Sequence, residues 1–239
     1  MEINVKIAGV PFSVILNNEE NAAAFEEYLS GEAPLFRVSL SRDYLEKAKR
    51  YYPVQDGRYV EFSELQFAVS RELQRYSLCA FHALSFTYEG RAYLITGRSG
   101  VGKTTQYRNL KALYGDRIGI MSGDKVLLGF GEDGITVHSC PWKGKENMGT
   151  VSSAPLGGIV LLEQKKENTI SLMENIDAAL PVLKQFITLY ESRDEAKLIA
   201  SFAEKLIEAG GVYLLRNNGD SESSALLFGT LIGKGRENG

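Results

Sequence analysis

The feature that most constrains this 239-residue chain is the stretch Gly97-Arg98-Ser99-Gly100-Val101-Gly102-Lys103-Thr104. It fits G-x-x-x-x-G-K-[ST], a pattern typical of loops that bind phosphate groups. The apolar run 92–96 before it predicts a buried strand, and residues 105–114 after it predict a helix that ends at Gly115. Strand, glycine-rich turn and helix in this order are the context that the motif requires. The sequence therefore predicts a nucleotide or phosphate site.

Each residue type in this loop has a physical reason to be there. Glycines let backbone N–H groups turn toward phosphate oxygens, and the following helix adds partial positive charge at its N-terminus. Lys103 is expected to contact the β- and γ-phosphates, and Thr104 to hold Mg²⁺ through its hydroxyl. Arg98 either touches a γ-phosphate or points to water. The expected nucleotide contacts are Gly97, Arg98, Ser99, Gly100, Val101, Gly102, Lys103, Thr104 and Thr105.

Composition limits the classes of protein to consider. The chain is 44% apolar and 24% charged, with a net charge of −3 and no strongly basic block, which argues against a nucleic-acid or anionic-membrane partner. Its start lacks the form of a signal peptide, and its aliphatic runs are too short to span a bilayer. Cys79 and Cys140 form no C-x-x-C pair, so we expect two free thiols in a cytoplasmic protein.

The order of the predicted elements indicates one α/β domain over residues 1–239. We expect a sheet-and-helix layer at 1–75, a nucleotide-binding core at 76–220, and a C-terminal helix and tail at 221–239. In the first third, other predicted elements are a hairpin within 1–16, a helix at 18–29, a strand at 58–62 and a helix at 63–76. The capping-box pattern Ser63-Glu64-Leu65-Gln66 opens the last of these helices. Later predicted elements are a loop at 138–157, a hairpin of 158–162 with 169–172, a helix at 176–190, and a helix from Ser192 to Ala209.

Asp124 ends the apolar strand predicted at 118–123, only 21 positions after Lys103. One helix and one returning strand fill this interval, and a right-handed crossover brings the strand back parallel to the one before the loop. Asp124 is then expected at the sheet edge that carries the phosphate loop. There it could bind Mg²⁺ or accept a proton from an attacking hydroxyl. The alternative is an acid that begins a turn.

Five further residues are candidates: two histidines and three residues of the predicted loop at 138–157. His82, fifteen positions before Gly97, is expected next to the loop, where it orients a phosphate or a catalytic acid, or is a satisfied core residue. For His138 we expect a loop residue. Lys143 and Lys145 could neutralise phosphate charge, and Trp142 could stack on an adenine or line a pocket; alternatively Trp142 anchors a solvated basic loop.

His82, the phosphate loop and the nearby Asp124 together resemble the catalytic domain of HPr kinase/phosphorylase, which has the phosphoenolpyruvate-carboxykinase-like P-loop fold, a mixed central sheet flanked by helices. The resemblance covers about residues 75–220. Within that family, the chain looks like a shorter, stand-alone branch. It implies Lys103 on the phosphates, Thr104 and Asp124 on Mg²⁺, Asp124 as the base that deprotonates the acceptor, and His82 beside it. It also implies that the chain can form homo-oligomers.

The sequence departs from that family at two acidic positions. Where the family has two consecutive acids at the strand end, this chain has Gly123 before Asp124, and the expected magnesium-binding glutamate falls near Ser153. The separate N-terminal domain and the stretch that binds the HPr protein are not recognisable. These differences argue against HPr as the substrate and against phosphorylase activity.

The sequence thus predicts a kinase that uses ATP and Mg²⁺ and transfers the γ-phosphoryl group to a hydroxyl of a peptide, protein or small molecule. GTP or pyrophosphate remains open as the donor. One alternative is a catalytically impaired nucleotide-binding module that regulates or recognises a peptide. Another is a different small-molecule P-loop kinase. A decarboxylating enzyme of the wider fold is disfavoured because the chain is short and has no oxaloacetate-binding arginine cluster.

Overall fold

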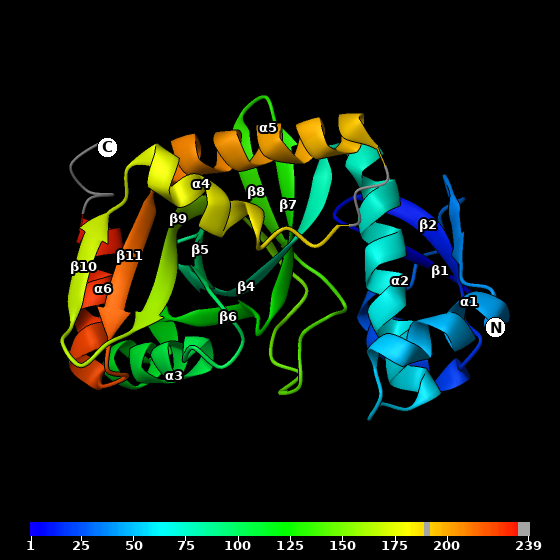
Figure 1. Ribbon diagram of the computed structural model, residues 1–239, viewed down its shortest axis with the longest axis horizontal. Coiled ribbons are helices and arrows are strands. Elements are labelled where there is room, and N and C mark those ends of the chain that lie inside the picture. Colours follow the sequence, from blue (N-terminus) through cyan, green and yellow to red (C-terminus); the bar gives the residue numbers. More distant parts are fainter. Residues whose placement is uncertain (189–191, 234–239) are drawn as a thin grey trace.

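The computed structural model describes residues 1–188 and 192–233 (Figure 1). Its strands are β1 (Glu2–Ile7), β2 (Val10–Ile15), β3 (Arg37–Ser39), β4 (Leu78–Tyr88), β5 (Arg91–Thr96), β6 (Gly119–Ser122), β7 (Lys125–Gly131), β8 (Gly134–Ser139), β9 (Ser153–Gln164), β10 (Thr169–Leu172) and β11 (Val212–Asn217). Its α-helices are α1 (Arg42–Ala48), α2 (Gly57–Leu73), α3 (Lys103–Tyr114), α4 (Asn175–Leu183), α5 (Arg193–Gly210) and α6 (Ser221–Gly233). The 3₁₀ helices are η1 (Glu19–Tyr28), η2 (Lys49–Tyr51), η3 (Gln74–Tyr76) and η4 (Gly115–Arg117).

The larger of two sheets has eight strands and is mixed. Its order is β10-β11-β9-β5-β4-β7-β8, with β6 paired to β4. β9 runs parallel to both β5 and β11, whereas β4 is antiparallel to β5, β6 and β7. β8 also pairs with β9, so five of the strands close into a ring. The predicted mixed sheet with flanking helices is confirmed.

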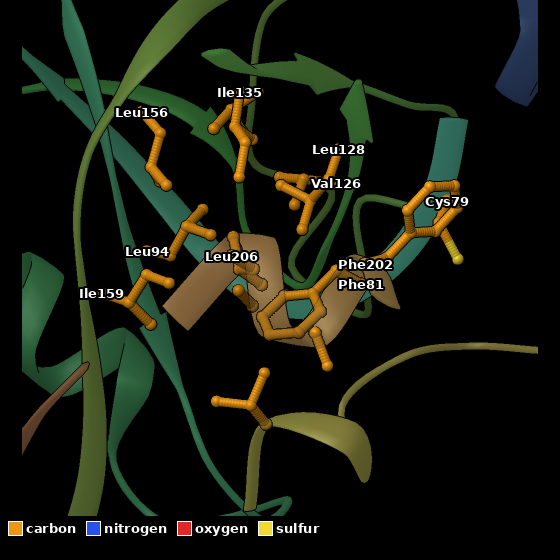
Figure 2. Close-up of a cluster of buried hydrophobic side chains, with 14 of the residues drawn as sticks. Cys79, Phe81, Leu94, Val126, Leu128, Ile135, Leu156, Ile159, Phe202 and Leu206 are labelled. Carbon is orange, nitrogen blue, oxygen red and sulfur yellow. The ribbon is translucent and has the colours of Figure 1, made fainter. Parts of the chain in front are cut away.

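Helices cover this sheet on two sides (Figure 1). On one side, α4 and α5 pack on a cluster that includes Phe81, Leu94 and Ile159, and Figure 2 shows Phe202 and Leu206 of α5 pointing into it. The α5 residues recur every three or four positions, as one face of a helix requires. On the other side, α3 and α6 cover a second cluster of strand residues. α5 begins with the capping box predicted at Ser192, whose side chain accepts from the Glu195 N–H.

The second sheet, of order β1-β2-β3, belongs to the first third of the chain. Its apolar face packs with η1 and α2 in a cluster that also contains Leu78 of β4, Leu127 of β7 and Trp142. Residues far apart in the sequence thus share one core between the two sheets. Because α2 lies at this junction, it packs beside the loop that carries Trp142. α2 therefore forms one wall of the candidate site described in the next section.

α2 differs from its prediction at its N-terminus. The helix begins at Gly57, so both the strand predicted at 58–62 and the helix start predicted at Ser63 are wrong. The Asp56 side chain caps the helix by accepting from the Tyr59 N–H at 2.8 Å. Glu61, inside the first turns, is only 1% exposed and accepts from the Asn17 N–H at 2.5 Å. This hydrogen bond compensates for burying the Glu61 carboxylate. It stabilises the segment as a helix, although its sequence pattern is typical of a strand.

The hairpin predicted for 158–162 with 169–172 is also wrong. β11 inserts between these strands, parallel to β9 and antiparallel to β10. The helix predicted at 18–29 is present as the 3₁₀ helix η1, with Asn18 and Leu29 as its caps. β8 extends through His138, so this residue lies in a strand instead of the predicted loop, and the loop that follows covers 140–152. Such pairings depend on distant parts of the chain, which local sequence patterns do not report.

The helix predicted at 176–190 ends at Leu183, and residues 189 and 190 of it lie outside the described part. The next residues leave the helix because they pair with β4. The His82 N–H donates to the Gln185 carbonyl, and the Ile187 N–H donates to the Ala80 carbonyl, both at 2.8 Å. Within residues 1–188 and 192–233, no helix is both long and apolar enough to cross a membrane. Both cysteines are buried free thiols, as predicted.

Candidate active site

The predicted phosphate loop connects β5 to α3. Gly97 is buried at the end of β5, and a Cβ there would lie 3.2 Å from the Leu162 carbonyl oxygen and from a methyl of Val101. Gly100 and Gly102 have φ of +76° and +105°, which favour glycine, and no described atom lies within 4 Å of a Cβ added at either position. We call this open loop the cradle, because its glycine conformations are of the kind that let backbone N–H groups turn toward phosphate.

α3 presents its N-terminus to this cradle. Gly102 is its N-cap residue, and no side chain caps the amides of the first turn among the described residues. The other side of the helix is fixed by Gln106, which is fully buried and donates to Asn217 at 3.1 Å and to Ser223 at 2.8 Å. These bonds fix α3 against β11 and α6, so the free amides and the helix dipole face the cradle.

Lys103, His82 and Asp124 meet at one point. The Lys103 Nζ lies 3.1 Å from the His82 Nε2 and donates to the Gly97 carbonyl at 3.3 Å. The His82 Nε2 lies 3.2 Å from the Asp124 Oδ1, and Lys125 pairs with the second oxygen of Asp124. His82 belongs to β4, Lys103 begins α3, and Asp124 lies between β6 and β7. The structure thus brings together the three residues proposed for catalysis.

The charges in this cluster perturb one another. Burial lowers the pKa of the Lys103 ammonium, the nearby Asp124 carboxylate opposes the shift, and Lys125 adds to it. Burial alone would raise the pKa of Asp124, but the hydrogen bond from His82 and the charge of Lys125 outweigh it and hold this pKa well below its usual range. Asp124 is therefore an ionised hydrogen-bond acceptor at neutral pH.

The His82 Nε2 has two competing partners. In a neutral ring this nitrogen either accepts from the Lys103 ammonium or carries a proton and donates to Asp124, but it cannot do both. The Thr96 hydroxyl donates to the His82 carbonyl at 2.6 Å, which fixes the backbone of β4 beside β5. His82 is thus placed to stabilise Asp124 whenever Lys103 turns to another partner such as a phosphate.

A cavity of about 1120 Å³ opens over this cluster. Its walls are the phosphate loop, the residues 141–148, the face of α2 that includes Phe62 and Gln66, and the segment 184–187. Its lining includes six Lys or Arg residues and two Asp or Glu residues, although the whole chain has a net charge of −3. This local excess of positive charge favours an anionic ligand. The volume exceeds the range of about 300–1,000 Å³ common for small-molecule sites, which leaves room for two substrates.

The predicted magnesium ligands fit that ion. Thr104 and Asp124 both line the cavity, and hydroxyl and carboxylate oxygens are ligands that Mg²⁺ accepts together with substrate phosphates. Elsewhere in residues 1–188 and 192–233, no group of three or more His, Cys, Asp and Glu side chains forms a metal-binding cluster.

The residues of the predicted basic loop differ in burial and in the contacts that they make. Trp142 is 4% exposed, donates its indole N–H to the Phe62 carbonyl at 2.8 Å and packs edge-on against Phe25. These contacts make Trp142 a hydrophobic anchor, and the residue also lines the cavity, so two of its predicted roles are observed together. Lys143 and Lys145 both line the cavity, but Lys143 is buried and pairs with Glu27, whereas Lys145 is exposed. Arg98 is exposed; Ser99 and Thr105 line the cavity.

Gly123 has a structural reason to lack a side chain. A Cβ there would lie 3.0 Å from the Lys143 carbonyl oxygen and 3.4 Å from Met148, and the Gly123 N–H donates to the Met148 carbonyl at 2.9 Å. Gly144, with φ of +81°, packs in turn against Asp124, where a Cβ would lie 2.6 Å from the Asp124 Cβ. The loop 140–152 thus occupies the space that a second acid would need. Ser153, the other expected acidic position, is exposed and pairs with His138.

We expect Gly123→Asp to lower the free energy of unfolding by roughly 1–3 kcal/mol, because the added side chain must displace the backbone of the loop 140–152. Urea denaturation followed by circular dichroism measures this change. Gly31→Asp is the matched control, since no described atom lies within 4 Å of a Cβ at Gly31. Equal stability of the two variants would show that the loop yields easily and that close packing does not explain Gly123.

Several lining residues were missed by the sequence interpretation, among them Lys125, Lys184 and Gln66. Lys125 follows Asp124 directly and could have been recognised from that adjacency. No local pattern marked Lys184 or Gln66 as a site residue. Lys184 directly follows α4, whose C-terminal end was predicted wrongly, and Gln66 was interpreted as part of a capping box.

Together, the loop, the charged cluster and the cavity define an α/β protein with a candidate site for an anionic ligand. No family model matches the sequence, and no curated protein matches it. Among solved structures, the chain is similar to the HPr(Ser) kinase/phosphatase from Coxiella burnetii, the family that the sequence resemblance named. The sequence identity is 11%, the match covers 66% of this chain and 96% of that chain, and the TM-score is 0.37. At this TM-score, the assignment of the site depends on the geometry of this chain alone.

Proposed function

We propose that the chain is a phosphotransferase that moves the γ-phosphoryl group of ATP to a hydroxyl group, with Mg²⁺ as its metal ion. The observation that carries this proposal is the convergence of Lys103, His82 and Asp124 within 3.1–3.2 Å beside an open phosphate cradle. A binding loop alone supports only phosphate recognition. An ionised carboxylate next to the cradle adds a group that can take a proton from an acceptor.

The residues divide the work as follows. The amides of the loop and of the α3 N-terminus bind the phosphates, and Lys103 leaves His82 and the Gly97 carbonyl to contact them. Thr104 and Asp124 would hold Mg²⁺, which neutralises charge on the phosphates. The acceptor oxygen forms a bond to the γ-phosphorus, the bond to the bridging oxygen of ADP breaks, and the hydroxyl proton passes to Asp124. His82, relieved of Lys103, donates to Asp124 and keeps it oriented.

A transfer assay tests this function. The purified chain is incubated with γ-labelled ATP, Mg²⁺ and a panel of seryl and threonyl peptides, free serine and sugars, and labelled products are separated. We expect transfer to at least one acceptor, and less without Mg²⁺. Replacing ATP by GTP or by pyrophosphate identifies the donor.

Gly123 and Ser153 favour a second candidate, a nucleotide-binding module without catalysis, because each replaces an acid that the resembled family uses. Binding of ATP with no labelled product from any acceptor, and no release of inorganic phosphate, would support this candidate and contradict the kinase.

A further inference from the structure

The register of the large sheet places Lys125 beside His82. In the antiparallel pairing of β4 with β7, Lys125 is the residue directly opposite His82. Side chains of such a cross-strand pair project from the same face of the sheet, with their Cβ atoms about 4.5–5.5 Å apart. On the other edge of β4, Ala83 pairs with Thr96 of β5, so His82 lies next to the start of the phosphate loop. Lys125 is therefore two strand spacings, or about 10 Å, from that loop.

The main chain of Lys125 is held in place, whereas its side chain is partly exposed. The Lys125 carbonyl accepts from the Ser122 hydroxyl at 2.5 Å and from the Cys140 thiol at 3.3 Å, and both of these side chains are fully buried. The Lys125 side chain is 24% exposed, lines the cavity and pairs with the second carboxylate oxygen of Asp124. Its ammonium group can thus exchange Asp124 for another anion in the cavity without a change of the backbone.

Lys125 differs from most of the other cations of the cavity. Six Lys or Arg residues line it within residues 1–188 and 192–233, and the ammonium groups of Lys103 and Lys125 are the two that contact His82 or Asp124. The remaining four are Arg58, Lys143, Lys145 and Lys184. The first two of these pair with acids of η1, and the last two are exposed. Lys103 and Lys125 are therefore the cations closest to the proposed reaction.

The two lysines lie at opposite ends of one chain of contacts. Lys103 contacts His82, His82 contacts the first oxygen of Asp124, and Lys125 contacts the second. Burial is the main cause of the lowered pKa of the Lys103 ammonium, and the charge of Lys125 adds to it, so the two ammonium groups repel each other. An anion that both lysines contact would remove this repulsion. The β- and γ-phosphates of a nucleotide are the anions expected at Lys103.

We propose that Lys125 is a second lysine that contacts the γ-phosphate of bound ATP, and that it exchanges Asp124 for this group when the nucleotide binds. This inference rests on the proposed function and adds a catalytic residue to it. The exchange opens the second oxygen of Asp124 to the acceptor hydroxyl, whose proton it takes, while His82 stays on the first oxygen. It also places a second positive charge beside the phosphoryl group that is transferred.

Calorimetry tests the contact without requiring catalysis. Affinities for ADP and for the β,γ-imido analogue of ATP are measured with Mg²⁺ in the wild type, Lys125→Met and Lys125→Gln, after circular dichroism has shown which variants fold. Because ADP has no γ-phosphate, we expect both variants to bind the analogue about tenfold more weakly, the effect of losing one hydrogen bond between charged groups, and to bind ADP within about twofold of wild type. Equal losses for the two nucleotides, or no loss for the analogue, overturn the proposal.

A double variant separates the contact from an indirect effect of charge. Without Lys125, the Asp124 carboxylate loses its partner and by itself repels a γ-phosphate. In Asp124→Asn this repulsion is absent, so adding Lys125→Met to that variant should still weaken the analogue about tenfold if Lys125 contacts the phosphate. If the double variant binds the analogue as tightly as Asp124→Asn does, Lys125 only compensates the charge of Asp124 and the proposal is wrong.

Two further variants serve as controls. Lys165 pairs with Glu163 at 3.1 Å outside the cavity, so Lys165→Met should leave both affinities at the wild-type values. Lys125→Arg keeps the positive charge, and we expect it to keep the ratio of the two affinities within about threefold of wild type. A folded Lys125→Arg that loses the analogue as strongly as Lys125→Met would contradict a role of this charge.

Turnover gives the second readout. Loss of one group that stabilises the transferred phosphoryl should lower the kcat of Lys125→Met by about 10²–10³-fold. Transfer by the wild type, combined with equal effects of Lys125→Met on ADP and on the analogue, overturns the contact and leaves the kinase standing. A selective loss of the analogue in Lys125→Met, with no transfer by the wild type to any acceptor, overturns the kinase and leaves the contact standing.

Discussion

Lys103→Ala is expected to abolish phosphoryl transfer and to weaken nucleotide binding strongly. Lys103 is 9% exposed, so its charge acts in a partly desolvated site where electrostatic contacts with phosphate are stronger than in water. Removing one such contact lowers the rate by about 10²–10³-fold. Isothermal titration calorimetry with a non-hydrolysable ATP analogue measures the binding, and the transfer assay measures the rate.

The same helix offers a control for this variant. Lys111 lies in the last turn of α3, far along the helix from the cradle. It is partly exposed and pairs with Asp116 at 3.0 Å. Lys111→Ala should bind nucleotide and transfer phosphate as the wild type does. If Lys103→Ala retained wild-type affinity while remaining folded by circular dichroism, the loop would not bind phosphate through this lysine, and the proposed site would be wrong.

The part of the site that could be predicted from the sequence consists of residues that lie close together along the chain. Gly97 to Thr104 requires only local geometry, because glycine conformations and a helix start follow from the residues themselves. Asp124 follows from one more step, since a helix and a returning strand across 21 positions leave few ways to place it. β6 and β5 are both antiparallel to β4, so they run in the same direction, as the crossover argument requires.

The rest of the fold depends on contacts that no local pattern reports. Ser63 fits a capping box as well as Ser192 does, yet only Ser192 caps a helix. Asp56 begins α2 instead, and burial of Glu61 against Asn17 extends it. The strand order β10-β11-β9 is fixed by the parallel pairing of β11 with β9 and its antiparallel pairing with β10, and both strands are distant from β11 in the sequence. The Gln66 Nε2, which has no hydrogen-bond partner within residues 1–188 and 192–233, is likewise a property of the folded chain, because a sequence gives no indication of which side chains lack partners.

Asp124→Asn is the second variant with a large expected effect. Asparagine keeps the shape of the side chain but cannot take up the acceptor proton, so transfer should fall about 10²–10⁴-fold. Asp116→Asn is the matched control, because Asp116 is fully exposed. Because Asp124 is also a predicted Mg²⁺ ligand, nucleotide affinity is measured both with and without Mg²⁺. A proton-accepting role predicts that affinity in Mg²⁺ stays within about threefold of wild type while turnover is lost.

Because the pKa of Asp124 is low, the stability of the Asp124→Asn variant must be measured together with its turnover. Since the folded pKa lies below the unfolded value of about 3.9, the ionised carboxylate stabilises the fold above that pH, and its contribution fades as the pH falls toward the folded value. Asp124→Asn should therefore unfold more readily than wild type at pH 7, and the difference should narrow below about pH 4. Turnover is compared at a temperature where both proteins are folded. Near-normal turnover under those conditions would exclude Asp124 as the base and leave His82 as the remaining proton acceptor among the three residues that meet at this point.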